Sequence, residues 1–202
     1  KGWRSGAEVQ RKKIPQWFLK ITNYSDELLN STDDLKGWPS RVKMMQKNWI
    51  GMSKGVLIKF NIKDTKESLE VFTTRVDTIF GVSFLAVSPN HNILDKIKSD
   101  AVKDFITKCK ALKVSEETVS NIEKEGVCTD LVAINPINGK EIPVWIANYV
   151  LSDYGSGCVM SVPAHDDRDY EFSIKYKLPI KHVIKNKDDD DKINSAYTGD
   201  GE

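Results

Sequence analysis

Apolar and polar residues alternate in short stretches from residue 55 onward, a period that is typical of half-buried β-strands. The pattern is clearest at residues 56–62, where Ile58, Phe60 and Ile62 alternate with polar or less apolar neighbours. Two continuous apolar runs, 82–87 and 158–162, favour strands that are buried on both faces. The predicted strands are residues 56–62, 69–73, 82–87, 131–134, 142–146, 158–162 and 180–184.

Helical spacing is found at two places among these strands. Apolar residues recur every three or four positions in residues 100–111, which predicts a helix with one buried face. Residues 166–176 form the second predicted helix, and acidic residues gather at its start.

The first fifty residues have a different pattern, with apolar residues that are interrupted by proline. One short helix is predicted to begin at Ser25 as its cap. A second has Pro39 in its first turn and a buried stripe of Val42, Met45 and Trp49. The segment has no obvious core of its own, which indicates a piece of a larger protein.

These elements predict a mainly β or α+β fold, barrel-like, with short helices at its periphery. Strands and helices alternate too irregularly for a doubly wound sheet. We expect a connective region at residues 1–54, the core domain at 55–184, and a loop with a return linker at 185–202. The loop carries a run of four aspartates and is predicted to be a solvated insertion.

Composition narrows the class of protein. The 202 residues include 30 Lys and Arg against 29 Asp and Glu, and the mean hydropathy is -0.42. These values exclude a wholly disordered chain, and no apolar run is long enough for a membrane span. The near-zero net charge argues against a broad surface for duplex nucleic acid, although it leaves room for a local path along a single strand.

Cysteine and histidine are too sparse and too scattered for a metal site. The three cysteines form no C-x-x-C pair, and there are three histidines. We therefore expect no metal, no cofactor and no disulfide framework. Because residues 1–10 lack the apolar stretch of a signal peptide, we expect a cytoplasmic or organellar protein rather than a secreted one.

The first candidate for chemistry is the peptide from Thr73 to Gly81, which follows a predicted strand. Its three threonine hydroxyls suit ribose hydroxyls or an ester carbonyl, and Arg75 suits a phosphate or a carboxylate. The alternative is structural: threonines at a strand end, with Asp77 capping a turn. The residues alone favour that alternative for this peptide.

The second candidate runs from Tyr154 to Phe172. Two close glycines allow a ligand to approach the backbone, and an apolar strand then leads to a polar cluster at a helix start. Asp166 and Asp169 are three residues apart, so we expect them on one helix face, where two carboxylates can hold an ammonium group or orient a water. Helix capping explains one of the aspartates, but it does not explain the whole cluster.

Taken together, the two peptides resemble the editing domain of class I aminoacyl-tRNA synthetases, the β-barrel-like insertion of the leucine, isoleucine and valine enzymes. Asp77 before Thr78 is similar to the leucyl type, of bacterial or organellar kind. The resemblance covers nearly the whole chain. The chain itself lacks both signatures of the aminoacylation site. The chain departs from the family at Val76, where proline is usual, and at Asp130, where glycine is usual.

The resemblance implies hydrolysis of the ester in tRNA(Leu) mischarged with isoleucine, norvaline or methionine, without aminoacylation by this chain. A second sieve is needed because one pocket separates side chains that differ by a methylene only about 10–200-fold, a value measured on this class of enzyme. The implied partners are the 3′ end of tRNA(Leu) and the rest of the synthetase. We expect a monomer that binds no membrane.

The resemblance also implies roles for individual residues. Asp169, supported by Asp166, holds the substrate's ammonium group and is expected at a pocket rim. Thr73 and Thr74 contact the ribose or orient water, and Thr78 excludes leucine from the side-chain pocket. The remaining implied substrate contacts are Val162 and Met160 in that pocket, Tyr154 against the adenine, and Arg75 and His165 as polar contacts.

Two other functions stay open. A module that grips the tRNA acceptor end without catalysis is the first, and the near-neutral charge counts against it. The editing domain of a valyl- or isoleucyl-tRNA synthetase is the second, and Asp77 counts against that.

Overall fold

The computed structural model describes residues 2–7, 15–111, 123–152, 155–185, 195–199 and 201. The chain divides into two compact units, Lys1–Lys54 and Gly55–Glu202. The predicted boundary at residue 185 stays a prediction, and most of the aspartate-rich run lies outside the described residues. No helix in the described ranges is long and apolar enough to cross a membrane.

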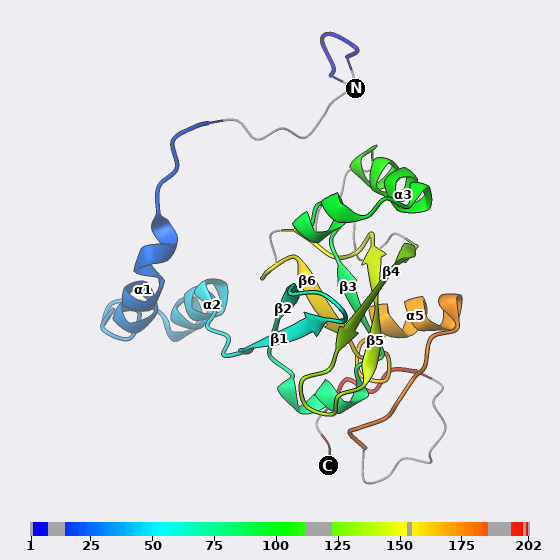
Figure 1. Cartoon of the computed structure of the whole chain (residues 1–202). Coiled ribbons are helices and arrows are strands. Elements are labelled where there is room, and N and C mark those ends of the chain that lie inside the picture. Colours follow the sequence, from blue (N-terminus) through cyan, green and yellow to red (C-terminus); the bar gives the residue numbers. More distant parts are fainter. Residues whose placement is uncertain are drawn as a thin grey trace. The chain divides into compact units, whose positions relative to one another are not determined.

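The unit Lys1–Lys54 is helical (Figure 1). It contains the 3-10 helix η1 (Ile21–Tyr24) and the helices α1 (Ser25–Ser31) and α2 (Ser40–Ile50). The residue at the N-cap of α1 is Tyr24 rather than Ser25, whose hydroxyl donates a hydrogen bond to the Thr22 carbonyl at 2.7 Å. The predicted start of the helix is therefore wrong by one position.

The predicted buried stripe of α2 is also wrong. Met45 is 60% exposed and Trp49 is 88% exposed, and α2 contains no buried residue. No apolar side chain is buried in the described part of this unit, which therefore offers no apolar core for the stripe.

The unit Gly55–Glu202 is built on a six-stranded sheet whose strands follow the order β2-β1-β4-β5-β3-β6. Neighbouring strands are antiparallel except for the parallel pair β3 and β5. The strands are β1 (Val56–Ile62), β2 (Ser68–Thr73), β3 (Phe84–Val87), β4 (Gly126–Ile134), β5 (Glu141–Ala147) and β6 (Cys158–Ser161).

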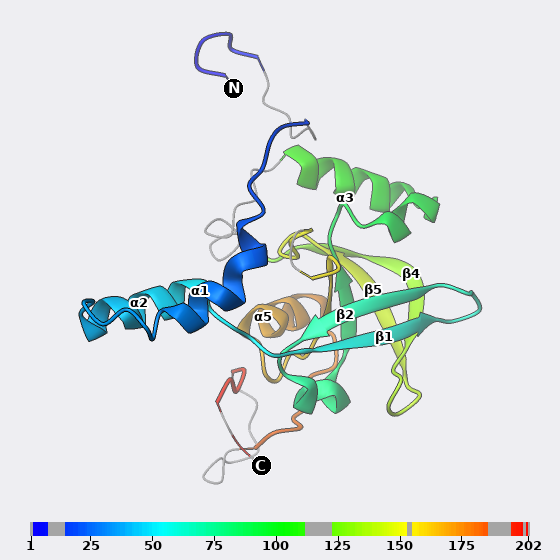
Figure 2. The same ribbon diagram turned by 90° about the vertical axis from the view of Figure 1, so that its left-hand side faces the viewer.

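The two end strands of this sheet, β2 and β6, approach each other, as Figures 1 and 2 show. The hydroxyl of Ser156, just before β6, donates a hydrogen bond to the Glu70 carbonyl of β2. The sheet is thus open in its strand order but curled, which confirms the predicted α+β fold with a barrel-like strand core. The helical elements around it are η2 (Val76–Gly81), η3 (Asn92–Lys96), α3 (Asp100–Ala111) and α5 (Asp167–Tyr176).

The predicted strand at residues 180–184 is wrong. These residues form no ladder with any described strand. The backbone N–H groups of Val183 and Ile184 instead donate to a side chain, that of His165, at 3.2 Å each. These N–H groups are therefore satisfied by a side-chain acceptor instead of by the carbonyl groups of a neighbouring strand.

An aromatic cluster attaches α5 to the sheet. The Phe172 ring stacks on Phe84 at 5.1 Å between centroids, and Trp145 and Tyr176 pack beside it at 5.5 and 4.5 Å. The Tyr176 hydroxyl also accepts a hydrogen bond from the backbone N–H of Gly126 in β4, at 2.9 Å. Burial of these rings fixes the position of α5, and therefore of its polar first turn.

Asp130, where the family usually has glycine, lies at an unusual backbone position. Asp130 adopts a left-handed conformation with φ of 62°, within the irregularity of β4 between Cys128 and Val132. Glycine adopts this conformation without steric cost, and aspartate tolerates it better than most residues do. The bulge of β4 therefore survives the substitution of its usual glycine.

Candidate functional site

Asp166 caps the helix α5. Its backbone is extended, and its Oδ1 accepts hydrogen bonds from the backbone N–H groups of Arg168 and Asp169 at 2.9 and 3.2 Å. The Arg168 guanidinium also binds both oxygens of this carboxylate, at 3.2 and 2.9 Å. Burial raises the pKa of Asp166, but the hydrogen bonds and charge of Arg168 outweigh it and lower the pKa overall.

This geometry gives Asp166 the capping role that sequence reasoning treated as the alternative. It precedes the helix rather than sharing a helix face with Asp169, and both of its oxygens are engaged. Asp166 therefore remains ionised and orients the first turn of α5. Its expected support of the substrate's ammonium becomes an indirect one, through the position of Asp169.

Asp169 lies in the interior and not at a pocket rim, because its residue is only 5% exposed. Its Oδ1 accepts a hydrogen bond from the Tyr149 hydroxyl at 3.0 Å, and its Oδ2 accepts one from the backbone N–H of Val162 at 2.9 Å. Burial, and then the negative charge of Asp166, raise the pKa of Asp169 to about 7. Two neighbouring carboxyl groups thus have pKa values shifted in opposite directions, which is typical of functional sites.

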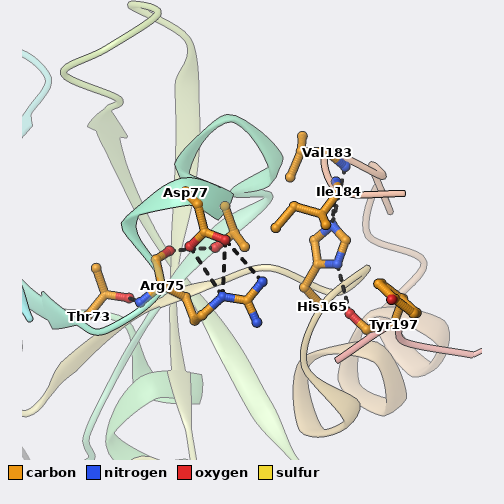
Figure 3. Close-up of polar contacts among 8 residues, drawn as sticks. Thr73, Arg75, Asp77, His165, Val183, Ile184 and Tyr197 are labelled. Atoms are coloured by element: carbon orange, nitrogen blue, oxygen red, sulfur yellow. Dashed lines mark hydrogen bonds and ion pairs between the residues drawn. The ribbon is translucent and has the colours of Figure 1, made fainter. Parts of the chain in front are cut away.

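The threonine-rich peptide follows β2 and folds back on itself (Figure 3). Thr73 accepts a hydrogen bond from the Arg75 backbone N–H at 3.0 Å, whereas Thr74 is exposed. The Arg75 guanidinium binds the Asp77 carboxylate through Nε and Nη2, at 3.0 to 3.2 Å. The hydrogen bond from Arg75 lowers the pKa of Asp77. Arg75 is therefore already paired within the peptide and is not a free cation for a phosphate.

Thr78 is buried in the short 3-10 helix η2, at 2% exposure. Its hydroxyl donates to the Arg75 carbonyl at 2.8 Å, which fixes the side chain in one orientation. Asn135, in the turn between β4 and β5, holds the same helix by donating from its side-chain amide to the Ile79 carbonyl at 3.1 Å. The turn between β4 and β5 thus helps to position Thr78.

Gly81 links the threonine peptide to the aspartate segment. A β-carbon at Gly81 would lie 2.9 Å from a methyl of Val183 and 3.0 Å from a methyl of Val162, so only glycine fits. Residues three apart in a 3-10 helix lie above one another, which places Thr78 over Gly81 on that face. Because the Val162 N–H binds Asp169, Val162 connects Asp169 to the short helix that contains Gly81 and Thr78.

His165 is engaged on both ring nitrogens, as Figure 3 shows. Its Nε2 accepts hydrogen bonds from the backbone N–H groups of Val183 and Ile184, so Nδ1 carries the proton and donates to the Tyr197 carbonyl at 2.9 Å. His165 therefore clamps two later segments of the chain beside Val162. A direct polar contact with substrate, as the resemblance implied, is not available to a ring that is bonded in this way.

The clamp predicts a dependence of stability on pH. Burial lowers the pKa of His165; His182 and Arg75 lower it further, while the Tyr197 carbonyl and Asp77 raise it. The unfolded chain then binds more protons than the native one, so the stabilisation is complete above a pH of about 6.5, the unfolded pKa, and is lost as the pH falls through the folded pKa.

Urea unfolding at pH 7.5 and 5.5 tests this expectation. At the lower pH the wild-type chain should lose stability relative to His165→Gln, which cannot titrate at this position; the opposite contribution of Asp169, whose pKa is raised, is present in both proteins. Burial also lowers the pKa of His91, so part of the pH dependence should remain in the variant. An equal change in stability in the two proteins would contradict the clamp.

For Met160 and Tyr154 the described residues give no contact that indicates a role. Met160 belongs to the hydrophobic core at 9% exposure, and Tyr154 lies outside the described residues. Sequence reasoning missed Tyr149, the buried partner of Asp169, because nothing in its local pattern indicates a contact twenty residues away.

Two of the three cysteines, Cys109 and Cys158, are buried thiols that resist ionisation. Burial raises the pKa of Cys109 to about 11 and that of Cys158 to about 12. Within the described ranges, no three histidine, cysteine or acidic side chains are arranged to hold a metal ion.

Comparison with known proteins places this geometry in a family. The family model described as "Leucyl-tRNA synthetase, editing domain" matches residues 47–202. Leucine--tRNA ligases of Legionella pneumophila (strain Corby) and Coxiella burnetii (strain Dugway 5J108-111) are each 50% identical over 204 and 205 residues, covering 100% of this chain and 25% of theirs. The chain spans about a quarter of the length of these relatives.

A solved structure agrees with the sequence comparisons. The crystal structure of a ternary complex of Agrobacterium radiobacter K84 agnB2 LeuRS, tRNA and LeuAMS matches with a TM-score of 0.74 and 39% identity. The match covers 96% of this chain and 24% of that one. The fold, the threonine peptide and the capped aspartate helix thus occur together in a chain that belongs to the family of leucyl-tRNA synthetase editing domains.

Proposed function

We propose that this chain hydrolyses the aminoacyl ester of tRNA(Leu) that carries isoleucine, norvaline or methionine, as part of a leucyl-tRNA synthetase. The observation that carries the proposal is Asp169, a buried carboxyl group joined through Val162 and Gly81 to the turn that holds Thr78. A carboxylate in such a place can bind an ammonium group, and a branched side chain beside it can select the amino acid.

Asp169 holds the substrate's α-ammonium group in this mechanism. An ionised carboxylate has about four acceptor sites, and Tyr149 and Val162 occupy two of them. The ammonium takes a third and favours the ionised form, as a neighbouring positive charge does. The ester carbonyl is then held at a fixed distance from the carboxylate.

Thr73 and Thr74 contact the terminal ribose or orient the attacking water. Water attacks the carbonyl carbon, a bond forms from its oxygen, and the bond from that carbon to the ribose oxygen breaks. The leaving oxygen takes up a proton that the water gives up, so no covalent intermediate with the protein is needed. Positioning of the two reactants supplies most of the acceleration.

The decisive experiment is deacylation of Ile-tRNA(Leu) and Leu-tRNA(Leu) by this chain, side by side. Rapid release of isoleucine with leucine left in place supports the proposal. Tight binding of both tRNAs without release of either would favour the non-catalytic module, and preference for mischarged tRNA(Val) or tRNA(Ile) would favour the related enzymes. An isoleucyl-adenosine analogue that resists hydrolysis should also raise the unfolding temperature. At a hundred times its Kd, it should increase the free energy of unfolding by about 2.7 kcal/mol.

A further inference from the structure

A polar hollow of about 500 Å³ lies on the unit Gly55–Glu202 and includes none of the residues assigned above. Its walls come from β2, from the segment that follows β3, and from the segment that precedes β6. Its principal polar side chains are Glu70, Ser88, Asn90, His91, Ser152 and Ser156.

The walls are held together by their own hydrogen bonds. Ser88 and Ser152 share one between their hydroxyls at 2.9 Å, and the Asn90 side-chain amide donates to the Ser152 hydroxyl at 3.2 Å. The segments that follow β3 and precede β6 are therefore fixed relative to each other. A ligand would meet hydroxyl and amide groups that are already oriented.

His91 adds a neutral donor to this hollow. Its Nδ1 accepts a hydrogen bond from the backbone N–H of Ile93 at 3.2 Å, so the ring proton lies on Nε2. The Cδ2 edge of the ring, next to Nε2, lies against Gly157, which also lines the hollow.

The lining has no lysine or arginine, and its one charged group is the exposed carboxylate of Glu70. An anionic ligand such as a phosphate is therefore disfavoured. Hydroxyls, an amide, an imidazole N–H and a carboxylate instead match the sugar hydroxyls and the amino-bearing edge of an unpaired nucleoside.

The hollow also lies close to the proposed reaction site along the chain. Glu70 precedes Thr73 by three residues on the same strand, about 10 Å along the backbone, with the two side chains on opposite faces. Ser152 and Ser156 stand in the sequence on either side of Tyr154, for which adenine stacking is expected. We propose that the hollow binds the nucleoside that precedes the terminal adenosine of the tRNA, an inference that rests on the proposed function.

Two substrates separate this inference from the proposed function. One is the isoleucyl ester of adenosine alone, and the other is the same ester on a trinucleotide that ends in that adenosine. The variant is Glu70→Ala/Asn90→Ala, which changes two exposed side chains of the hollow. The matched control, Asn48→Ala/Asp104→Ala, changes two exposed helical side chains that do not line the hollow.

We expect the hollow variant to lose about tenfold in kcat/KM on the trinucleotide ester, the effect of one or two hydrogen bonds, and less than twofold on the adenosine ester. The control should match the parent on both. Equal losses on the two esters, or no loss on the trinucleotide, would overturn the inference.

Failure of the parent chain to hydrolyse either ester would count against the proposed function and not against the hollow. Calorimetric binding of the uncharged trinucleotide then decides the matter. The parent should bind it more tightly than adenosine, and the hollow variant should bind it about tenfold more weakly than the parent does. A parent that binds the two equally would overturn the inference.

Discussion

Replacing Asp169 by asparagine should abolish most ester hydrolysis while the fold stays intact. Asparagine can accept from the Val162 N–H with its oxygen and donate to the Tyr149 hydroxyl with its amide, because a tyrosine hydroxyl both donates and accepts. Only the charge is lost. A lost hydrogen bond to a charged group costs about 1.5–3 kcal/mol, which is about a 10- to 150-fold loss in kcat/KM for Ile-tRNA(Leu).

Asp169→Ala provides the contrast. It leaves the Tyr149 hydroxyl and the Val162 N–H without a partner in a buried place, at about 1–3 kcal/mol for each group. This variant should therefore lose both stability and activity, whereas Asp169→Asn should lose activity alone. An asparagine variant that deacylates like the parent would refute the role of Asp169.

The raised pKa of Asp169 predicts how the stability of the parent and of Asp169→Asn should differ with pH. The native state holds the proton more tightly than the unfolded state, so this group stabilises the fold fully below a pH of about 3.9 and that contribution is lost as the pH rises through about 7. The stability of the parent should therefore decline relative to Asp169→Asn over this range. Over the same range kcat/KM of the parent should rise, because the ionised carboxylate is the form that binds ammonium.

Thr78→Ser should release Leu-tRNA(Leu) to hydrolysis, and Thr78→Val should not. Serine keeps the hydroxyl that donates to the Arg75 carbonyl, but it lacks the methyl group that is expected to exclude leucine from the pocket. Valine keeps the branched shape, which is stiff at χ1, but loses that hydrogen bond, at about 1 kcal/mol. The two variants thus distinguish exclusion of leucine by the shape of Thr78 from stabilisation of η2 by its hydroxyl.

Thr78→Ala and Thr78→Tyr extend the test. Alanine should admit leucine, so that discrimination is lost and catalysis is kept, and tyrosine should block every amino acid. Deacylation rates on cognate and noncognate tRNA measure both effects. If Thr78→Ala and Thr78→Ser continue to spare leucine, Thr78 is only a buried residue of the turn.

Local periodicity predicted those elements whose partners are close in sequence. The strand Val56–Ile62 and the helix Asp100–Ala111 follow directly from alternation and from helical spacing. The pattern failed where a distant group decides the structure. The apolar stretch at residues 180–184 forms no strand, because the side chain of His165 binds its backbone.

The same division holds for the candidate site. Residue types pointed to the peptides that carry Thr78 and Asp169, but they could not show which carboxylate is buried. Asp166 and Asp169 differ in environment because one ends a loop beside Arg168 and the other faces Tyr149 from a helix. The Asp166–Arg168 pair is local, but the contact of Asp169 with Tyr149 arises only when α5 packs on the sheet.

The aromatic cluster that attaches α5 has a consequence for spectroscopy. Trp145 is the single tryptophan of the unit Gly55–Glu202, and the other four lie in Lys1–Lys54 at exposures of 47% to 101%. Replacing those four exposed residues by phenylalanine would leave one fluorophore, packed against Phe172 and Tyr176. Its emission would then report in real time the docking of the helix that positions Asp169, without an added label.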